Sequence, residues 1–569
     1  MKPKLNNKKQ SFLEGAMVLV IATGLVKIIG AIFKIPLGNL LGELGSGYFQ
    51  NAYDLYLPIY SLAMAGLPIA VSRMVADSVA RNRYRDARQI FRMARRTFLI
   101  TGLTGFVLML AVSYPYVLSI GGKTEALPGI LTIAPSILFC CVMSSYRGYY
   151  EGLRNMTPTA VSQVIEAMGK LVLGLGFAYG ARAMGLAVQY QAAGAILGIT
   201  IGTLLGAIYL WVRFHVSGDG ITRRDLMESP AAYSGRHTVR LLAAIAIPVV
   251  LGSMANQIAS LVDAVTVQNR LTHMVTQAGM GLESIYPEMM ADLSASYGSA
   301  AEVLDHVPTY LYGCYKVYAF SIFNLVPTLT SVLGISALPA LTTAWASRSR
   351  RAVRASVESV LRITSIIVFP CGLGMSVLSS GVLNLLFHSK PIGAAIAAPN
   401  LFILGFAAIF AGLVMPMTNM LQAIGKQKIP VRNIIVGAML KIVVNFALVG
   451  IPTVNIHGAS AGTLVCYMYM FVMNFYALCK YTKLIPNLLR TFVKPLAAGL
   501  FCAAAAWAAN GLLGGRLSGS VTTIAAIAIA GIVYLAALVL LRVLTKDDIL
   551  MLPKGKKIAK TLEKLHWIG

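Results

Sequence analysis

Long apolar segments recur along this chain, and they constrain its fold more than any other feature. A transmembrane helix needs about 20 mostly apolar residues. Fourteen segments meet that requirement, near residues 15–41, 48–76, 97–120, 128–150, 158–181, 189–213, 240–268, 309–346, 361–386, 398–424, 431–451, 458–479, 495–513 and 520–542. The eighth is too long for one straight span, so we expect part of it to project from the membrane. Only 12% of the residues are charged, about half the fraction of a typical soluble protein. We therefore predict an all-α polytopic membrane protein.

The distribution of basic residues predicts the orientation. With the N-terminus inside, the inner segments and the helix ends beside them hold 38 of the 48 lysines and arginines, whereas the outer loops hold five. Cytoplasmic loops carry such an excess, so both termini are predicted to be cytoplasmic. The net charge of +27 then reflects topology and contact with anionic membrane lipids. No nucleic-acid partner is expected.

The chain also contains an internal repeat. EGLRNMTPTAVSQVIEAMGK matches QAIGKQKIPVRNIIVGAMLK, which makes Lys170 and Lys441 equivalent at a separation of 271 residues. Six helices followed by six in the same orientation are what two parallel repeats produce. We expect the following parts: a basic cytoplasmic tail at 1–14, a first lobe at 15–214, a cytoplasmic linker at 215–239, a second lobe at 240–479, two further helices at 495–543 and a cytoplasmic tail at 544–569.

Five cations remain within or beside the expected spans: Lys27, Lys34, Lys170, Lys316 and Lys441. A charge at the bilayer centre costs about 2.5–3.5 kcal/mol, so these side chains must face a polar interior. Gln163 and Glu166 share a helix face with Lys170. Together these residues are predicted to line a cationic cavity that suits an anionic substrate. A second interpretation of Glu166 is open, in which it only neutralises Lys170 at the i,i+4 spacing.

Acidic residues are scarcer within the spans. Asn256, Ser260 and Asp263 share one helix face at i, i+4 and i+7, which suits either a site for a coupling ion or hydrogen bonding between helices. Asp54 is a further candidate for such an ion site. The sequence does not identify the ion.

Other kinds of site are not indicated. The seven cysteines contain no C-x-x-C pair and the seven histidines show no ligand spacing, so neither a metal site nor a cofactor is expected. Gly169-Lys170 and Gly425-Lys426 lack the earlier glycine of a Walker A motif, which argues against ATP hydrolysis. No cluster of His, Asp or Glu at one depth indicates an enzyme.

Two stretches resemble a known transporter family. RGYYEGLRNMTPTAVSQVIEAMGK resembles the fourth-to-fifth-helix signature of the polysaccharide-flippase branch of the multidrug/oligosaccharidyl-lipid/polysaccharide (MOP) exporters. GLVKIIGAIFKIPLGNLLGELGSGYFQNAYDLY is similar to the first two helices of its stage V sporulation protein B group, which is akin to the MurJ-type lipid II flippases. The resemblance covers nearly the whole chain.

The resemblance implies an alternating-access flippase in the bacterial cell membrane, with two six-helix lobes around a V-shaped cavity. Its cargo would be an undecaprenyl-pyrophosphate-linked saccharide for the cell wall, a polysaccharide or the spore cortex. In MurJ-type members, cations on the first, second and eighth helices line the cavity. Lys27 and Lys34 would fill the first-helix role and Lys316 the eighth, whereas the second helix offers only Asp54 before Arg73. A cation-coupled multidrug exporter is the alternative, although cationic drugs favour acidic cavities.

Overall fold

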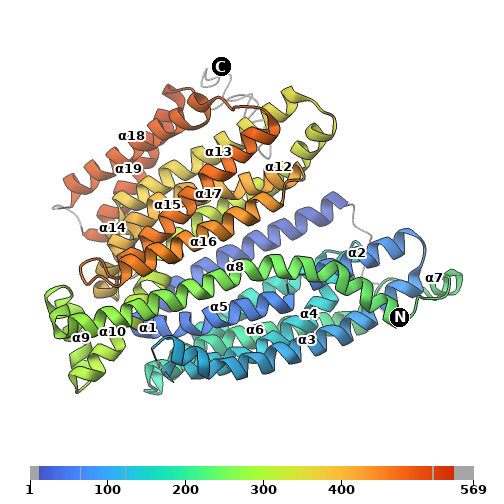
Figure 1. The fold of residues 1–569 in the computed structure, drawn as a ribbon, viewed down its shortest axis with the longest axis horizontal. Helices are drawn as coiled ribbons and strands as arrows, with labels where there is room; N and C mark the ends of the chain where they lie inside the picture. Colours follow the sequence, from blue (N-terminus) through green and yellow to red (C-terminus); the bar gives the residue numbers. More distant parts are fainter. Residues whose placement is uncertain (1–11, 65, 122–123, 515–517, 544–569) are drawn as a thin grey trace. The chain divides into compact units, whose positions relative to one another are not determined.

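The computed structural model describes residues 12–64, 66–121, 124–514 and 518–543 (Figure 1). Contacts between helices divide the chain into two units, Met1–Asn269 and Arg270–Gly569, and the linker expected at 215–239 falls in the first. The first unit contains α1 (Phe12–Met64), α2 (Leu67–Ala80), α3 (Tyr84–Ser119), α4 (Leu127–Gly152), α5 (Thr157–Ala183), α6 (Val188–Ser217), α7 (Arg223–Glu228) and most of α8 (Gly235–Ala278).

The second unit is also built from helices. It contains α9 (Pro287–Ser296), α10 (Ala300–Gly313), α11 (Phe320–Phe323), α12 (Leu325–Ala346), α13 (Arg350–Val377), α14 (Ser379–Leu386), α15 (Pro391–Ala423), α16 (Lys428–Val449), α17 (His457–Thr482), α18 (Lys494–Leu513) and α19 (Gly519–Leu540). Short 3₁₀ segments lie at Thr124–Ala126 and Gly279–Ser284, and π-helical segments at Cys314–Ala319 and Leu489–Val493.

Among the described residues, eleven helices are long and apolar enough to cross a membrane. The seventh expected span, 240–268 within α8, is not among these eleven, and the first two expected spans differ from the sequence prediction. The first two are joined in α1, which bends at Gly42, where φ is 68° and ψ is −169°. Glycine reaches this region without the steric penalty that a Cβ atom imposes. As expected, the eighth segment, 309–346, is not one straight helix, because the π-helical turn Cys314–Ala319 separates α10 from α11 and α12.

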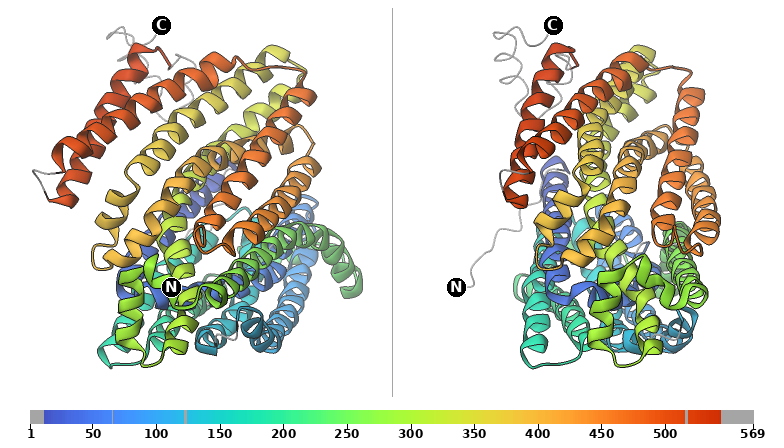
Figure 2. Two further views of the ribbon diagram at one scale, coloured as in Figure 1. Left: turned by 60° about the vertical axis from the view of Figure 1, so that its left-hand side comes forward. Right: turned by 90° about the vertical axis from the view of Figure 1, so that its left-hand side faces the viewer.

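The packing order of the first unit recurs in the second. In the first unit, α4 packs against α3 and α6, and α5 packs against α6. In the second, α15 packs against α13 and α17, and α16 packs against α17. The two helices that follow, α18 and α19, pack against each other, and α18 also contacts α13 (Figure 2). The two units therefore share one arrangement, as a parallel repeat predicts.

A close approach of backbones fixes the rotation of α5. A Cβ atom on Gly202 of α6 would lie 2.9 Å from the Glu166 carbonyl oxygen and 3.0 Å from the Lys170 nitrogen. A Cβ atom on Gly169 would lie 2.4 Å from the Gly202 Cα atom. Small residues allow membrane helices to pack this closely. The contact holds one face of α5 on α6 and thereby determines where Lys170 projects.

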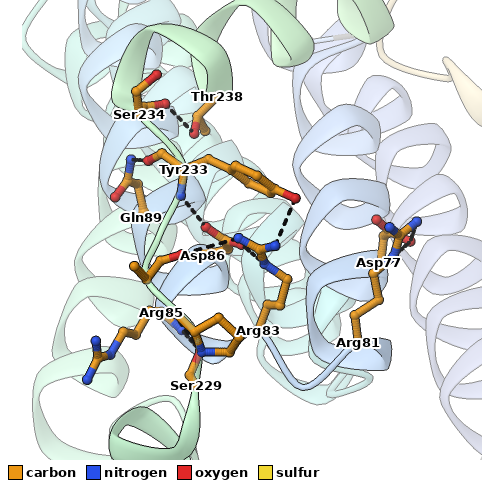
Figure 3. Close-up of polar contacts among 12 residues, drawn as sticks. Asp77, Arg81, Arg83, Arg85, Asp86, Gln89, Ser229, Tyr233, Ser234 and Thr238 are labelled. Atoms are coloured by element: carbon orange, nitrogen blue, oxygen red, sulfur yellow. Dashed lines mark hydrogen bonds and ion pairs between the residues drawn. The ribbon is translucent and has the colours of Figure 1, made fainter.

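Residues 218–234, here called the strap, are fastened to the start of α3. The Arg88 guanidinium makes two hydrogen bonds to the Asp219 carboxylate, of 2.9 and 3.0 Å. Figure 3 shows the other end of the strap, where Arg83 donates to the Tyr233 hydroxyl at 2.8 Å and lies over its ring. The Tyr233 amide donates to the Asp86 carboxylate at 2.7 Å. The strap is therefore an integral part of the first unit.

Candidate functional site

Lys170 lies in an aromatic pocket between α5 and α1. Its Nζ atom is 5.0 Å from the ring centroids of both Phe33 and Tyr53, and it donates to the Tyr53 hydroxyl at 3.5 Å. Phe49 stacks on Tyr53 with 5.8 Å between centroids. Rings attract a cation through their negatively charged faces. Lys170 forms no ion pair with any described residue, so its ammonium is held chiefly by aromatic rings.

Lys34 belongs to a short hydrogen-bonded chain within α1. Its Nζ atom donates to Gln50 Oε1 at 3.5 Å, and Gln50 Nε2 donates to the buried Asp54 at 2.8 Å. Gln50 and Asp54 come from the part of α1 beyond the bend at Gly42, so the bend lets the two legs of α1 meet. Asp54 was predicted as a possible ligand of a coupling ion. In the structure it belongs to the hydrogen-bonded chain of Lys34, one of the lysines predicted to bind the cargo.

Lys27 and Gln163 lie on α1 and α5. Lys27 is exposed. One helical turn before it, the Thr23 hydroxyl donates to Gln163 Oε1 at 3.5 Å. The first leg of α1 is therefore in polar contact with the predicted polar face of α5 at Gln163, and the leg beyond Gly42 is in polar contact with it at Lys170, through Tyr53.

Glu166 pairs with Arg147 and not with Lys170. Arg147 Nη2 lies 3.0 Å from Glu166 Oε2, and Arg147 Nε donates to Ser162 Oγ at 2.9 Å. The Arg147 side chain is 9% exposed and that of Glu166 is 28% exposed. The interpretation of Glu166 as the neutralising partner of Lys170 is therefore wrong. The carboxylate compensates a buried cation on α4.

A signal for this pairing was present in the sequence. Residues 153–156 form the turn between α4 and α5. Arg147 and Ser162 lie at equal distances on either side of that turn, as partners in an antiparallel helical hairpin do. Glu166 follows Ser162 by one helical turn. The interpretation from the sequence considered only the i,i+4 spacing of Glu166 and Lys170 within α5.

The second unit holds a comparable cationic cluster. Lys316 is buried in the π-helical turn, 5.1 Å from the Phe320 centroid, 5.6 Å from that of Tyr312 and 5.9 Å from that of Tyr315. Lys441 of α16 lies 6.0 Å from the same Phe320 ring. Single π-helical turns occur frequently at functional sites. Two lysines thus share one aromatic ring in the second unit.

The repeat relates these clusters. Phe49 and Phe320 are 271 residues apart, the separation that also relates Lys170 and Lys441. The positions equivalent to Arg147 and Ser162 are Thr418 and Asn433. There Asn433 donates to Asn474 at 2.8 Å, and Asn474 donates to Thr418 at 3.4 Å. Both units thus keep the lysine beside aromatic rings, although those rings do not occupy equivalent positions: Lys170 lies by Phe33 and Tyr53, and Lys441 by Phe320. The ion pair of the first unit is replaced by a neutral network in the second.

The candidate ion face on α8 is not uniformly buried. Asp263 is buried and Ser260 is exposed, whereas the side chain of Asn256 lies outside the described residues. Nearby, Gln268 of α8 donates to Asn51 of α1 at 2.7 Å. Within the described residues, no group of three or more His, Cys, Asp or Glu side chains could hold a metal ion.

Comparisons with known proteins place the chain among transporters. The profile described as "Polysaccharide biosynthesis protein" matches residues 12–345, more than half of the chain, and that of "Lipid II flippase MurJ" matches residues 315–518. Lipid II flippase MurJ of Bacillus subtilis (strain 168) is 22% identical over 545 residues, which cover 92% of this chain and 94% of that protein. Stage V sporulation protein B of the same organism is 22% identical over 553 residues, covering 96% and 98%.

Solved structures of transporters share the fold. Lipid II flippase MurJ in an inward closed conformation matches with a TM-score of 0.58 at 14% identity, over 92% of this chain and 98% of that one. An inward-facing multidrug resistance MATE family transporter of the MOP superfamily matches with a TM-score of 0.56 at 16% identity, over 80% and 98%. At these identities the likeness concerns the fold alone. On the profile match, which covers more than half of its length, the chain belongs to the polysaccharide biosynthesis protein family.

Proposed function

We propose that this protein is a flippase that moves an undecaprenyl-pyrophosphate-linked saccharide precursor across the bacterial cell membrane by alternating access. In the first unit, Lys170, Lys34 and Lys27 would contact the pyrophosphate. In the second unit, Lys316 and Lys441 would do so. Both termini would be cytoplasmic.

The observation that carries this proposal is the state of Lys170. A lysine within a membrane helix normally pairs with an acid, yet the acid one turn away is committed to Arg147. The aromatic rings of Phe33 and Tyr53 stabilise the ammonium without neutralising it. The lysine is therefore available to an anionic group, and charge-assisted hydrogen bonds to phosphate are among the stronger ones.

The surroundings of Asp54 disfavour the alternative function, export of cationic drugs. A binding site for such drugs requires a carboxylate that can face the cation. Asp54 is buried and accepts a hydrogen bond from Gln50, which in turn accepts one from Lys34. Its charge therefore acts on a neighbouring lysine, and the cluster as a whole remains cationic.

Binding of undecaprenyl pyrophosphate, the part shared by all such cargoes, tests the proposal. We expect Lys170→Met to weaken binding by about tenfold or more, because a hydrogen bond to a charged group contributes about 1.5–3 kcal/mol. Lys170→Arg should retain part of the affinity, since it keeps the charge but changes the geometry. The measurement is the shift of the thermal unfolding midpoint of the purified protein as the lipid is titrated.

Lys480→Met is the matched control. Lys480 is an exposed lysine on α17 whose Nζ atom lies 5.8 Å from the Tyr476 ring centroid, outside both clusters. It should bind the lipid like the unaltered protein. Equal affinity of the Lys170→Met variant and the unaltered protein would remove Lys170 from the cargo site.

A further inference from the structure

A basic hollow in the second unit is lined by residues other than those of the Lys316 and Lys441 cluster. It has a volume of about 330 Å³ and is formed by the end of α12, the start of α13 and the end of α17. Its lining includes Trp345, Arg348, Arg350, Tyr481 and Lys483. Three of the segments that the sequence predicts to be cytoplasmic meet there, because Lys426 from a third loop lies 4.7 Å from the Tyr481 ring centroid.

Among the residues that the structure describes, no acid neutralises the cations of this hollow. Its described lining contains no acidic residue, and Arg348, Arg350 and Lys483 form no ion pair with any described residue. Arg354, one turn further along α13, is paired by contrast and lies 2.9 Å from Glu358. The hollow therefore offers positive charge to an anionic ligand.

Two of the cations adopt an unfavourable backbone conformation. Arg348 follows α12 with φ of 53°, and Lys483 follows α17 with φ of 54°. Glycine or asparagine usually occupies this left-handed position after a helix. Non-glycine residues in this region tend to gather at ligand-binding sites, where the surrounding structure maintains the strain. Here both strained residues direct a positive charge to the same hollow.

The rim of the hollow distinguishes a lipid from a soluble anion. Trp345 and Tyr481 are both partly exposed, at 37%, and such aromatic residues favour the level of the headgroups. Immediately after the lining residue Leu484, the large apolar side chains Ile485 and Leu488 are exposed. An apolar surface beside a basic, aromatic hollow suits acyl chains attached to a phosphate.

We propose that this hollow binds the phosphate of an anionic phospholipid from the cytoplasmic leaflet. Arg348, Arg350 and Lys483 would contact the phosphate, and Trp345 and Tyr481 would lie beside the glycerol backbone. The site is separate from the proposed cargo site, and its occupancy does not depend on which precursor the protein transports.

Binding of phosphatidylglycerol to the full-length protein in detergent tests this proposal. The double variant Arg348→Gly with Lys483→Gly should bind this lipid more weakly, by about fivefold for each charge removed. Its lipid-free thermal unfolding midpoint should be equal to or higher than that of the unaltered protein, because glycine relieves the left-handed conformation. This second readout separates loss of the site from failure to fold.

Three results would overturn the proposal. Arg354→Gln removes a paired charge from the same helix and should leave phosphatidylglycerol affinity unchanged. An equal loss of affinity in this variant would indicate attraction to the whole basic surface. Glycerol phosphate should not reproduce the effect of the lipid, and an equal response would indicate a site for a soluble anion. Unchanged phosphatidylglycerol affinity in the double glycine variant would exclude the site.

Discussion

Three charged residues of the hairpin formed by α4 and α5 have different tasks. The carboxylate of Glu166 compensates the buried guanidinium of Arg147 at 3.0 Å. Lys170, one turn further, faces the rings of Phe33 and Tyr53. Removing one partner of a buried ion pair leaves the other charge uncompensated. Removing Lys170 leaves no uncompensated acid behind, so its loss should affect function more than stability.

The ion pair between Arg147 and Glu166 should contribute measurably to stability. Glu166→Gln should lower the free energy of unfolding by about 3 kcal/mol, at the low end for a broken buried pair because Glu166 is partly exposed. Adding Arg147→Met should restore most of that stability, because it removes the buried charge that Glu166→Gln leaves uncompensated. In the second unit, the positions equivalent to Arg147 and Ser162 are the neutral Thr418 and Asn433, which are joined through Asn474. Thermal unfolding of both variants in detergent measures the effect.

A different second substitution distinguishes the two possible partners of Glu166. Lys170→Met combined with Glu166→Gln should be no more stable than Glu166→Gln alone. Recovery of stability with Lys170→Met, and not with Arg147→Met, would show that the carboxylate pairs with Lys170.

The helices illustrate what could and could not be predicted from the sequence. Apolar length located eleven spans that the structure also shows among the described residues, because a helix that crosses lipid needs a long run of apolar residues. The bend at Gly42 and the π-helical turn at Cys314–Ala319 were not predicted. Both are local changes of backbone conformation that do not alter the pattern of apolar residues in the sequence. The partner of Glu166 was missed for a related reason, since it depends on how α4 and α5 align across their turn.

The contacts between the strap and α3 should protect the strap from proteolysis. Arg88→Ala removes both hydrogen bonds to Asp219, so the strap should detach more often and proteolysis within residues 218–234 should be faster. Arg224→Ala is the control, because it removes only an exposed ion pair with Glu228. Such exposed pairs contribute little. Limited proteolysis of the purified variants measures the cleavage rate. Equal rates for Arg88→Ala and the unaltered protein would mean that these contacts do not hold the strap.

At the scale of the complete chain, the internal repeat places equivalent lysines, Lys170 and Lys441, in the two units, and both are proposed to bind the cargo. Each unit holds one of the two equivalent lysines near aromatic residues, Lys170 near Phe33 and Tyr53 in the first and Lys441 near Phe320 in the second. The sequence predicted the equivalence of Lys170 and Lys441 because the repeat preserves the separation of 271 residues. It could not predict the aromatic surroundings, since these come from α1 and α10–α11, which are distant in the chain.

Translocation itself is the most direct test of the proposed flippase. The purified protein is reconstituted into vesicles that contain a fluorescent undecaprenyl-pyrophosphate-linked disaccharide in the inner leaflet, and a membrane-impermeant quencher reports its arrival outside. We expect the unaltered protein and Lys480→Met to raise the rate above that of protein-free vesicles, and Lys170→Met to reduce it to the protein-free rate. A rate with the unaltered protein equal to that of empty vesicles, or full activity in Lys170→Met, would contradict this mechanism.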